Sequence, residues 1–319
     1  MWGYSGRGDR RARPIQSLTG ALMDNATDRP LAGIVLRLMS GILFTGMMVC
    51  VKAVSDAVPL GQTVFFRSAF ALLPIVIFMT WRREFPRALA TRKPLGHLVR
   101  SGLGAAAMFA SFAAVARLPV AEATLLAQLS PVAMAVGGVL LLGERFTLHR
   151  AAAFALVLAG VAALVVPDLG ESRGQVMGYG LGVLAALLTA GALVTVRRIS
   201  RTETAASIAF YFVLVTALAG LATLPLGWVA VSGQTLALLV LAGLFGGAAH
   251  ICMTLALRYA EVSRLAPFEY VALIWPVLAD LAIFGLAPSG GFLVALPLVL
   301  GGAALAALEG RRLRRPLRQ

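Results

Sequence analysis

Ten long apolar runs follow one another along the chain, and they restrict its fold more than any other feature. They cover residues 32–53, 60–80, 97–116, 119–143, 150–167, 177–196, 206–230, 235–257, 263–286 and 291–309. A bilayer core about 30 Å thick requires about 20 helical residues to cross it. The runs are continuous rather than alternating, which favours helices over the strands of a membrane barrel. The sequence therefore predicts an all-α integral membrane protein with ten transmembrane helices.

The composition supports the same class and excludes others. Hydrophobic residues make up 59% of the 319 residues, and charged residues make up only 13%. A soluble domain of this composition would expose large apolar patches. The formal net charge of +14 does not indicate binding to nucleic acid, because the basic residues stand in short clusters between the apolar runs. We therefore exclude an ordinary cytosolic enzyme and a disordered chain, and we expect the lipid bilayer as the surroundings.

The positions of Lys and Arg predict the orientation of the helices. The segments that would share one side of the membrane carry 22 of the 28 Lys and Arg residues, whereas the opposite side has Arg117 and Arg173. Loops rich in Lys and Arg stay on the cytoplasmic side of a membrane. Both termini are therefore predicted to be cytoplasmic, with a basic segment at 1–30 and a basic tail at 310–319.

The two halves of the chain resemble each other. A shift of 142 positions places Gly143 on Gly285 and Gly160 on Gly302. Each half holds five runs, at 31–167 and 177–309, and the linker 168–176 is predicted to be periplasmic. Because five is odd, the second half enters from the opposite side of the membrane. This predicts a 5+5 inverted repeat around a central cavity, an arrangement typical of secondary transporters.

Three segments resemble one family. The segment EATLLAQLSPVAMAVGGVLLLGERF is similar to the signature of the drug/metabolite transporter superfamily, in its ten-span EamA-type branch. Glu122, Pro131, Gly143 and Glu144 stand where that pattern has an opening residue, a mid-helix proline and a closing Gly-Glu pair. FFRSAFALLP, which contains Arg67, and PFEYVALIWPVLADLAIFG resemble the same branch.

The resemblance implies a carrier of the bacterial inner membrane. Four helices of each half would line a central cavity, and the fifth and tenth would brace the outside. It also implies a secondary transporter that exports small amphipathic metabolites by alternating access, with neutral or aromatic amino acids as the closest match. The alternatives are an uptake carrier for metabolites or cofactors, or a drug exporter. One departure is Gly285-Leu286, where the family commonly repeats Gly-Glu.

Ionisable residues within the runs are candidates for function, because they are costly inside a bilayer. Glu269 and Asp280 are eleven residues apart, which places them within about 20° on one helix and about 16 Å apart along its axis. They form either a polar stripe along the pathway or two hydrated ends of a span. His250 is either a proton carrier or a hydrogen-bonded packing residue. Glu269, Asp280 and His250 are the candidates for proton coupling.

Uncharged polar residues complete the predicted substrate cavity. Thr124 and Gln128 are four residues apart on one helical face, and the repeat sets Gln128 opposite Tyr270. An amide and a phenol that face one cavity would suit a zwitterion, although both groups also serve helix–helix hydrogen bonds. Trp275 lies near the middle of its run, away from the membrane interface that Trp prefers, and is interpreted as cavity lining, a gate or core packing.

The remaining signals concern mechanism and assembly. The chain has no phosphate-binding glycine loop and no His or Cys pair with metal-ligand spacing, so the sequence predicts no metal, no cofactor and no enzyme activity. The pairs Gly178-Gly182 and Gly243-Gly247 allow close helix contacts but are too common to indicate more than a monomer or weak dimer. Arg67 within the second run requires a partner that the sequence does not identify.

Overall fold

The computed structural model is all-helical and describes residues 30–86, 89–134, 147–168, 173–200, 202–260 and 262–312. In chain order its elements are α2 (Pro30–Val54), α3 (Leu60–Trp81), α4 (Pro94–Val115), α5 (Val120–Ala127), α7 (Leu148–Val165), η2 (Val166–Asp168), α8 (Arg173–Ile199), α9 (Ala205–Leu221), η3 (Leu224–Leu226), α10 (Gly233–Tyr259), α11 (Val262–Val271), α12 (Ile274–Ala279), the π-helical turn η4 (Asp280–Phe284) and α13 (Gly290–Arg312). Each predicted run contains helical structure. The predicted all-α membrane fold is therefore confirmed.

Six of these helices are long and apolar enough to cross a membrane: α2, α3, α4, α8, α9 with η3, and α10. Shorter apolar helices account for the other four runs. The N-terminal segment before Pro30 and the Gly143-Glu144 pair lie outside the described residues. The predicted linker 168–176 overlaps α8, which begins at Arg173, and the predicted tail overlaps α13, which continues to Arg312.

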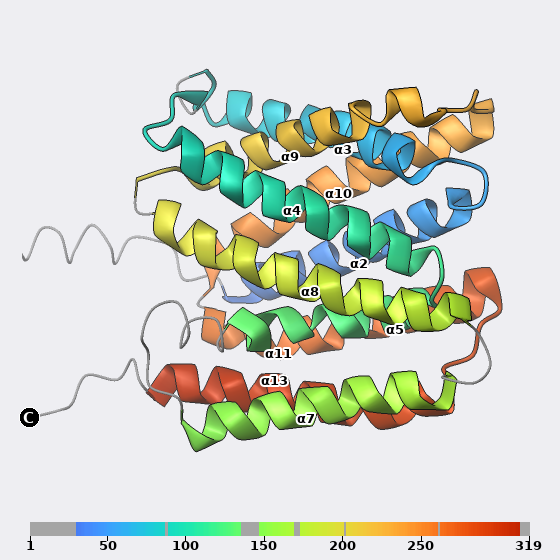
Figure 1. Ribbon diagram of the computed structural model, residues 1–319. Coiled ribbons are helices and arrows are strands. Elements are labelled where there is room, and N and C mark those ends of the chain that lie inside the picture. The colour runs from blue at the N-terminus through green and yellow to red at the C-terminus, as the bar shows by residue number, and fades with distance from the viewer. Residues whose placement is uncertain are drawn as a thin grey trace, which may run out of the picture.

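The helices lie side by side in one elongated bundle (Figure 1). α10 packs against α2 and α3, α4 packs against α8 and α9, and α3 also packs against α9. α7 and α13 form a pair at the lower edge of Figure 1. We call the two ends of the bundle the Pro30 end, where α2 begins, and the Val54 end, where α2 ends.

Small residues allow the closest of these contacts. A Cβ atom on Gly243 of α10 would lie 2.8 Å from the backbone oxygen of Arg67 in α3, and Gly247 faces Pro74 of the same helix. A Cβ on Gly182 of α8 would lie 2.5 Å from Leu126 Cδ1. The small-xxx-small pairs seen in the sequence therefore serve contacts within the chain.

The fourth span is interrupted, although the sequence predicts one continuous helix over 119–143. α5 ends at Ala127, Gln128 forms a turn, and helical structure resumes at 129–134. Pro131 has no N–H group to bond the carbonyl of Ala127, four residues earlier. Ser130 Oγ donates to that carbonyl at 2.7 Å instead. The hydroxyl thus satisfies the backbone group that the proline leaves without its helical partner.

The ninth span is also interrupted, where one helix was expected over 263–286. α11 ends at Val271, α12 begins at Ile274, and the π-helical turn η4 follows directly. Pro276 removes the helical bond to the carbonyl of Ala272, which accepts from Trp275 N at 3.3 Å. The seventh span is shorter than the expected 206–230, because α9 ends at Leu221 before the Pro225 turn.

Candidate functional site

A cavity of about 210 Å³ lies between the two interrupted spans and α2 and α4. Its polar lining includes Arg37, Thr45, Ser111, Thr124 and Gln128. Its other lining residues are Gly41, Phe44, Met48, Val115, Ala123, Ala127, Ala272, Leu273 and Pro276. The residues at both helix breaks therefore border the same space. We call it the central cavity.

Two predicted site residues, Thr124 and Gln128, line the central cavity. Thr124 Oγ1 donates to the carbonyl of Val120, one turn back on its own helix, at 2.7 Å. Gln128 occupies the turn at the end of α5. The i, i+4 spacing therefore located two residues that share one cavity.

Trp275 lies beside this cavity but does not line it, and Tyr270 does not line it either. A Cβ on Gly41 would lie 3.4 Å from Trp275 Cδ1, so α2 approaches the indole closely. The indole Nε1 is buried without a hydrogen-bond partner among the described residues. Tyr270 packs against the apolar cluster that includes Leu129 and Val132. The side chain of Glu269 lies outside the part of the chain whose side chains are described.

Asp280 binds the beginning of another helix. Its side chain is 3% exposed, and its two carboxylate oxygens accept the backbone N–H groups of Val120 at 3.0 Å and Ala121 at 2.7 Å. The first N–H groups of a helix have no partner within the helix and attract negative charge. Asp280 of the ninth span therefore caps α5 of the fourth span at the Val54 end.

Glu122 follows Ala121 in α5, and its carboxylate accepts hydrogen bonds from two other parts of the chain. Its Oε2 accepts from the hydroxyl of Tyr179 in α8 at 2.8 Å, and its Oε1 accepts from Ser289 Oγ, before α13, at 2.7 Å. Lys52 Nζ donates to the carbonyls of Val115 at 3.2 Å and Leu118 at 2.6 Å. Lys52, Glu122, Tyr179, Asp280 and Ser289 are called the Val54-end cluster.

The Val54-end cluster was only partly visible in the sequence. Asp280 stood out as a polar residue in an apolar run, and Glu122 matched a family pattern. Tyr179 and Ser289 gave no signal, because their roles depend on contacts with a residue 57 and 167 positions away. The cluster connects α2, α5, α8 and η4 at one end of the bundle.

His250 lies on α10 and lines a second cavity of about 210 Å³ between α3, α9 and α10. The imidazole contacts Phe44 edge-on, with ring centroids 5.1 Å apart, and Phe212 at 6.3 Å. Phe44 lines the central cavity, so this ring pair borders both cavities. Thr254, one turn further, donates to the His250 backbone carbonyl at 2.8 Å and does not bond the imidazole.

Two arginines lie within the same region of the bundle. Arg67 of α3 is 1% exposed, and its Nε lies 3.3 Å from Met47 Sδ. The guanidinium of Arg100 in α4 lies 4.1 Å from the centroid of the Phe212 ring. The sequence indicates that Arg67 requires a partner, whereas it gives no signal for Arg100. We call these two residues the arginine pair.

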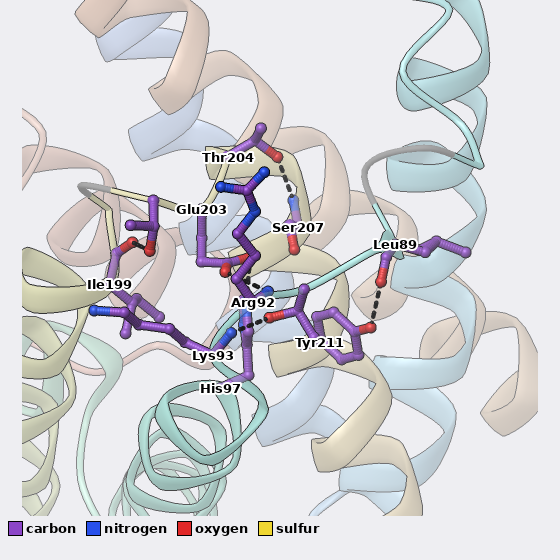
Figure 2. Close-up of polar contacts among 11 residues, drawn as sticks. Leu89, Arg92, Lys93, His97, Ile199, Glu203, Thr204, Ser207 and Tyr211 are labelled. Carbon is purple, nitrogen blue, oxygen red and sulfur yellow. Dashed lines mark hydrogen bonds and ion pairs between the residues drawn. The ribbon is translucent and has the colours of Figure 1, made fainter.

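A buried ion pair joins the first turn of α4 to the loop before α9 at the Pro30 end (Figure 2). His97 Nε2 lies 3.1 Å from Glu203 Oε2, and the backbone N–H of Arg92 donates to Glu203 Oε1 at 2.9 Å. Figure 2 also shows Tyr211, whose hydroxyl donates to the carbonyl of Leu89 at 2.6 Å. The hydrogen bond from His97 holds the pKa of Glu203 below its usual range.

Comparisons with known proteins identify the family. The model of the EamA-like transporter family matches residues 31–166. The chain is 30% identical to the pseudopaline exporter of Pseudomonas aeruginosa, over 76% of this chain and 84% of that protein. It is 31% identical to the riboflavin transporter of Rhizobium johnstonii, over 90% of this chain and 95% of that protein. It is 29% identical to an aromatic amino acid exporter of Ancylobacter novellus, over 64% and 72% respectively.

The fold has a counterpart among solved structures. One crystal structure superposes with a TM-score of 0.62 at 24% identity, covering 89% of this chain and 99% of that one. The family match and the two relatives at 30% identity or more agree with the helical membrane fold. The chain therefore belongs to the EamA-like transporter family of the drug/metabolite transporter superfamily, and it is a multi-pass secondary transporter of small metabolites rather than an enzyme.

Proposed function

We propose that the chain exports small amphipathic metabolites by alternating access, and that neutral or aromatic amino acids are the first substrates to test. One observation carries this proposal: both interrupted spans contribute to the central cavity. Interrupted helices near the middle of a bundle are a recurrent way for carriers to present backbone groups to a substrate. The relative that exports aromatic amino acids supports this choice of substrate.

The chemistry of the central cavity suits such a molecule. Gln128, Thr45 and Ser111 offer hydrogen bonds, while Phe44 and Met48 supply an apolar wall. Pockets for drug-sized ligands measure about 300–1,000 Å³. At about 210 Å³, the central cavity favours a smaller molecule.

The contacts between helices support an inverted repeat of two units, 31–167 and 177–309. If α2 corresponds to α8 and α4 to α10, the contact of α2 with α10 corresponds to that of α8 with α4. The contact of α3 with α10 likewise corresponds to that of α9 with α4. Each of these four contacts is present. The excess of Lys and Arg supports a cytoplasmic Pro30 end.

Alternating access requires that the two ends of the pathway open in turn. In this structure the Val54-end cluster ties η4 to the start of α5 and so holds that end together. We propose that it separates when the carrier opens to the periplasm. For proton coupling we favour Glu269 and His250 over Asp280, because both oxygens of Asp280 already accept backbone N–H groups. A monomer or weak dimer suffices for this mechanism.

Transport of a flavin-like cofactor is a second candidate function. The riboflavin transporter is the relative that matches 90% of this chain, more than the two exporters do. The volume of the central cavity argues for the smaller metabolites instead. Counterflow of labelled riboflavin in proteoliposomes distinguishes the two candidate functions.

Counterflow in proteoliposomes tests the proposal. Vesicles are preloaded with unlabelled amino acids and receive labelled phenylalanine, methionine or threonine outside. We expect saturable accumulation by the wild-type protein and a clear reduction by Gln128→Ala. Gln234→Ala, at an exposed position near the start of α10, is the matched control and should exchange normally.

Glu269→Gln in the same assay tests proton coupling. We expect exchange to persist and its dependence on a pH gradient to disappear. Exchange that Gln128→Ala leaves unchanged would remove the central cavity from the proposal. A folded protein that exchanges none of these amino acids would remove the amino-acid assignment, and exchange of riboflavin alone would establish the second candidate.

A further inference from the structure

Three guanidinium nitrogens of the arginine pair lack a hydrogen-bond partner among the described residues. Arg67 Nη1 and Arg100 Nε and Nη1 are buried and form no hydrogen bond among the described residues. The ion pairs found in that part of the chain join other residues, Arg82 with Glu84 and His97 with Glu203. Neither arginine therefore has a carboxylate partner among the side chains that the structure describes.

The contacts of α9 and α10 bring the two guanidinium groups into one region. A Cβ on Gly246 of α10 would lie 2.7 Å from Arg67 Nη2, and His250 is one turn further along the same helix. The Phe212 ring contacts both the Arg100 guanidinium, at 4.1 Å, and the His250 ring, at 6.3 Å between centroids. A helical turn rises about 5.4 Å, so the Arg67 guanidinium lies about one turn of α10 from His250, and Phe212 connects Arg100 to the same imidazole.

Unpaired charge in a membrane interior is unfavourable, and the surroundings offset only part of the cost. Phe212 faces the Arg100 guanidinium, and the Met47 thioether lies 3.3 Å from Arg67 Nε. Neither contact supplies negative charge. Buried charges in proteins are normally paired, and those inside membranes commonly mark the path of a substrate.

The position of the arginine pair fits a substrate path. His250, which lies close to it, lines the second cavity, and Phe44, in contact with His250, lines the central cavity. A molecule that moves between the cavities would pass this ring pair. Guanidinium groups bind carboxylates through paired N–H donors, and the rings of Phe44 and Phe212 offer an apolar surface beside them.

We propose that the arginine pair binds the carboxylate of a small substrate with an apolar body. The proposal deepens the proposed function, on which it rests, by naming the charge that the substrate carries. It assigns Arg67 and Arg100 to substrate binding and leaves Gln128 and the central cavity to the uncharged part of the molecule.

Thermal unfolding of the full chain in detergent tests this site directly. The probe is phenylacetate, and phenylacetamide is its uncharged isostere. A ligand that binds only the folded protein raises the unfolding temperature. We expect phenylacetate to raise it by about 2–4 °C at saturating concentration and phenylacetamide to leave it unchanged. This comparison requires no variant.

Arg67→Met and Arg100→Met should each abolish the effect of phenylacetate. Without the probe, their unfolding temperatures should equal or exceed that of the wild type, because an unpaired buried charge is replaced by an apolar side chain. Arg198→Met removes an exposed arginine in the last turn of α8 and should retain the full effect.

Several results would overturn the proposal. Equal protection by phenylacetamide, or by inorganic phosphate alone, would exclude a site for a carboxylate with an apolar body. A lower unfolding temperature of Arg67→Met without the probe would show that Arg67 has an acidic partner within the chain. If the protein exchanges amino acids but phenylacetate does not protect it, the proposed carboxylate site at Arg67 and Arg100 is wrong. If phenylacetate protects it but no amino acid is exchanged, only the assignment of amino acids as substrates is wrong.

Discussion

Two buried polar regions of this transporter differ in how their charged groups are satisfied. In the Val54-end cluster, both oxygens of Asp280 and both oxygens of Glu122 accept hydrogen bonds. In the arginine pair, three guanidinium nitrogens have no hydrogen-bond partner among the described residues. The first region connects helices from both halves of the chain, and the second lies next to Phe212 and His250.

Charged groups with all their hydrogen bonds formed within the chain stabilise the structure, whereas charged groups without partners are available to bind a ligand. A fully satisfied buried network holds its helices in one arrangement, because each broken bond exposes a group with no alternative partner. A region with unsatisfied cations retains the capacity to bind an anion. Removing a charge should therefore destabilise the Val54-end cluster and should not destabilise the arginine pair.

The largest effect is expected for Asp280→Ala. The substitution removes two hydrogen bonds from a charged acceptor to the start of α5, each worth about 1.5–3 kcal/mol. We expect the free energy of unfolding to fall by about 3–6 kcal/mol. Thermal unfolding in detergent measures the loss. Asp56→Ala, at an exposed position near the same end, is the control and should change stability little.

The same variant tests whether this end opens. Cys50 of α2 is 6% exposed, and Cys252→Ser leaves it as the single thiol. Asp280→Ala in that background should label faster with a maleimide than the Cys252→Ser protein itself. Unchanged labelling together with unchanged stability would show that Asp280 does not hold the Val54 end.

The sequence predicts more of the fold than of the site, and the reason is physical. A bilayer fixes the length and composition of every span, so ten apolar runs indicated ten helical segments without knowledge of any contact. The interruptions have local causes at Pro131 and Pro276, both of which are visible in the sequence. The compensating bond from Ser130 is also local, but a serine before a proline is too common to signal it.

The site depends on contacts that leave no sequence pattern. Thr124 and Gln128 were found because helical spacing alone places them on one face. The sequence predicts Asp280 either in a polar stripe or at a hydrated end of its span, yet its partners are backbone N–H groups about 160 positions earlier. Backbone groups are the same in every sequence, so nothing in the sequence distinguishes this role.

A smaller effect is expected at Gly246, and it sharpens the description of the arginine pair. In Gly246→Ala the new methyl group would lie 2.7 Å from Arg67 Nη2 and from Met47 Sδ, so the guanidinium must move. Both atoms are at flexible ends, and alanine favours the helix by about 1 kcal/mol, so stability should change by less than about 1 kcal/mol.

Protection by phenylacetate, however, should be lost in Gly246→Ala. Gly102→Ala on α4 is the matched control, because nothing lies within 4 Å of the added methyl group. It should keep the full protection. If Gly246→Ala is protected as well as Gly102→Ala, the position of the Arg67 guanidinium does not matter for the anion.

The smallest effect concerns pH and a third buried pair, His97 with Glu203. Because the pKa of Glu203 is lower in the folded than in the unfolded chain, the folded state binds fewer protons in acid. The pair therefore stabilises the fold above the usual pKa of a glutamate, about 4.3, and this contribution is lost as the pH falls towards the lower pKa of the folded state.

Between pH 6 and pH 3, the unfolding temperature of the wild type should fall by about 1–2 °C more than that of Glu203→Gln. Glu84→Gln, whose exposed carboxylate pairs with Arg82 at 2.7 Å, serves as the control and should follow the wild-type curve. Parallel curves for the wild type and Glu203→Gln would mean that the pair joins α4 to the loop before α9 without contributing to the acid sensitivity of the fold.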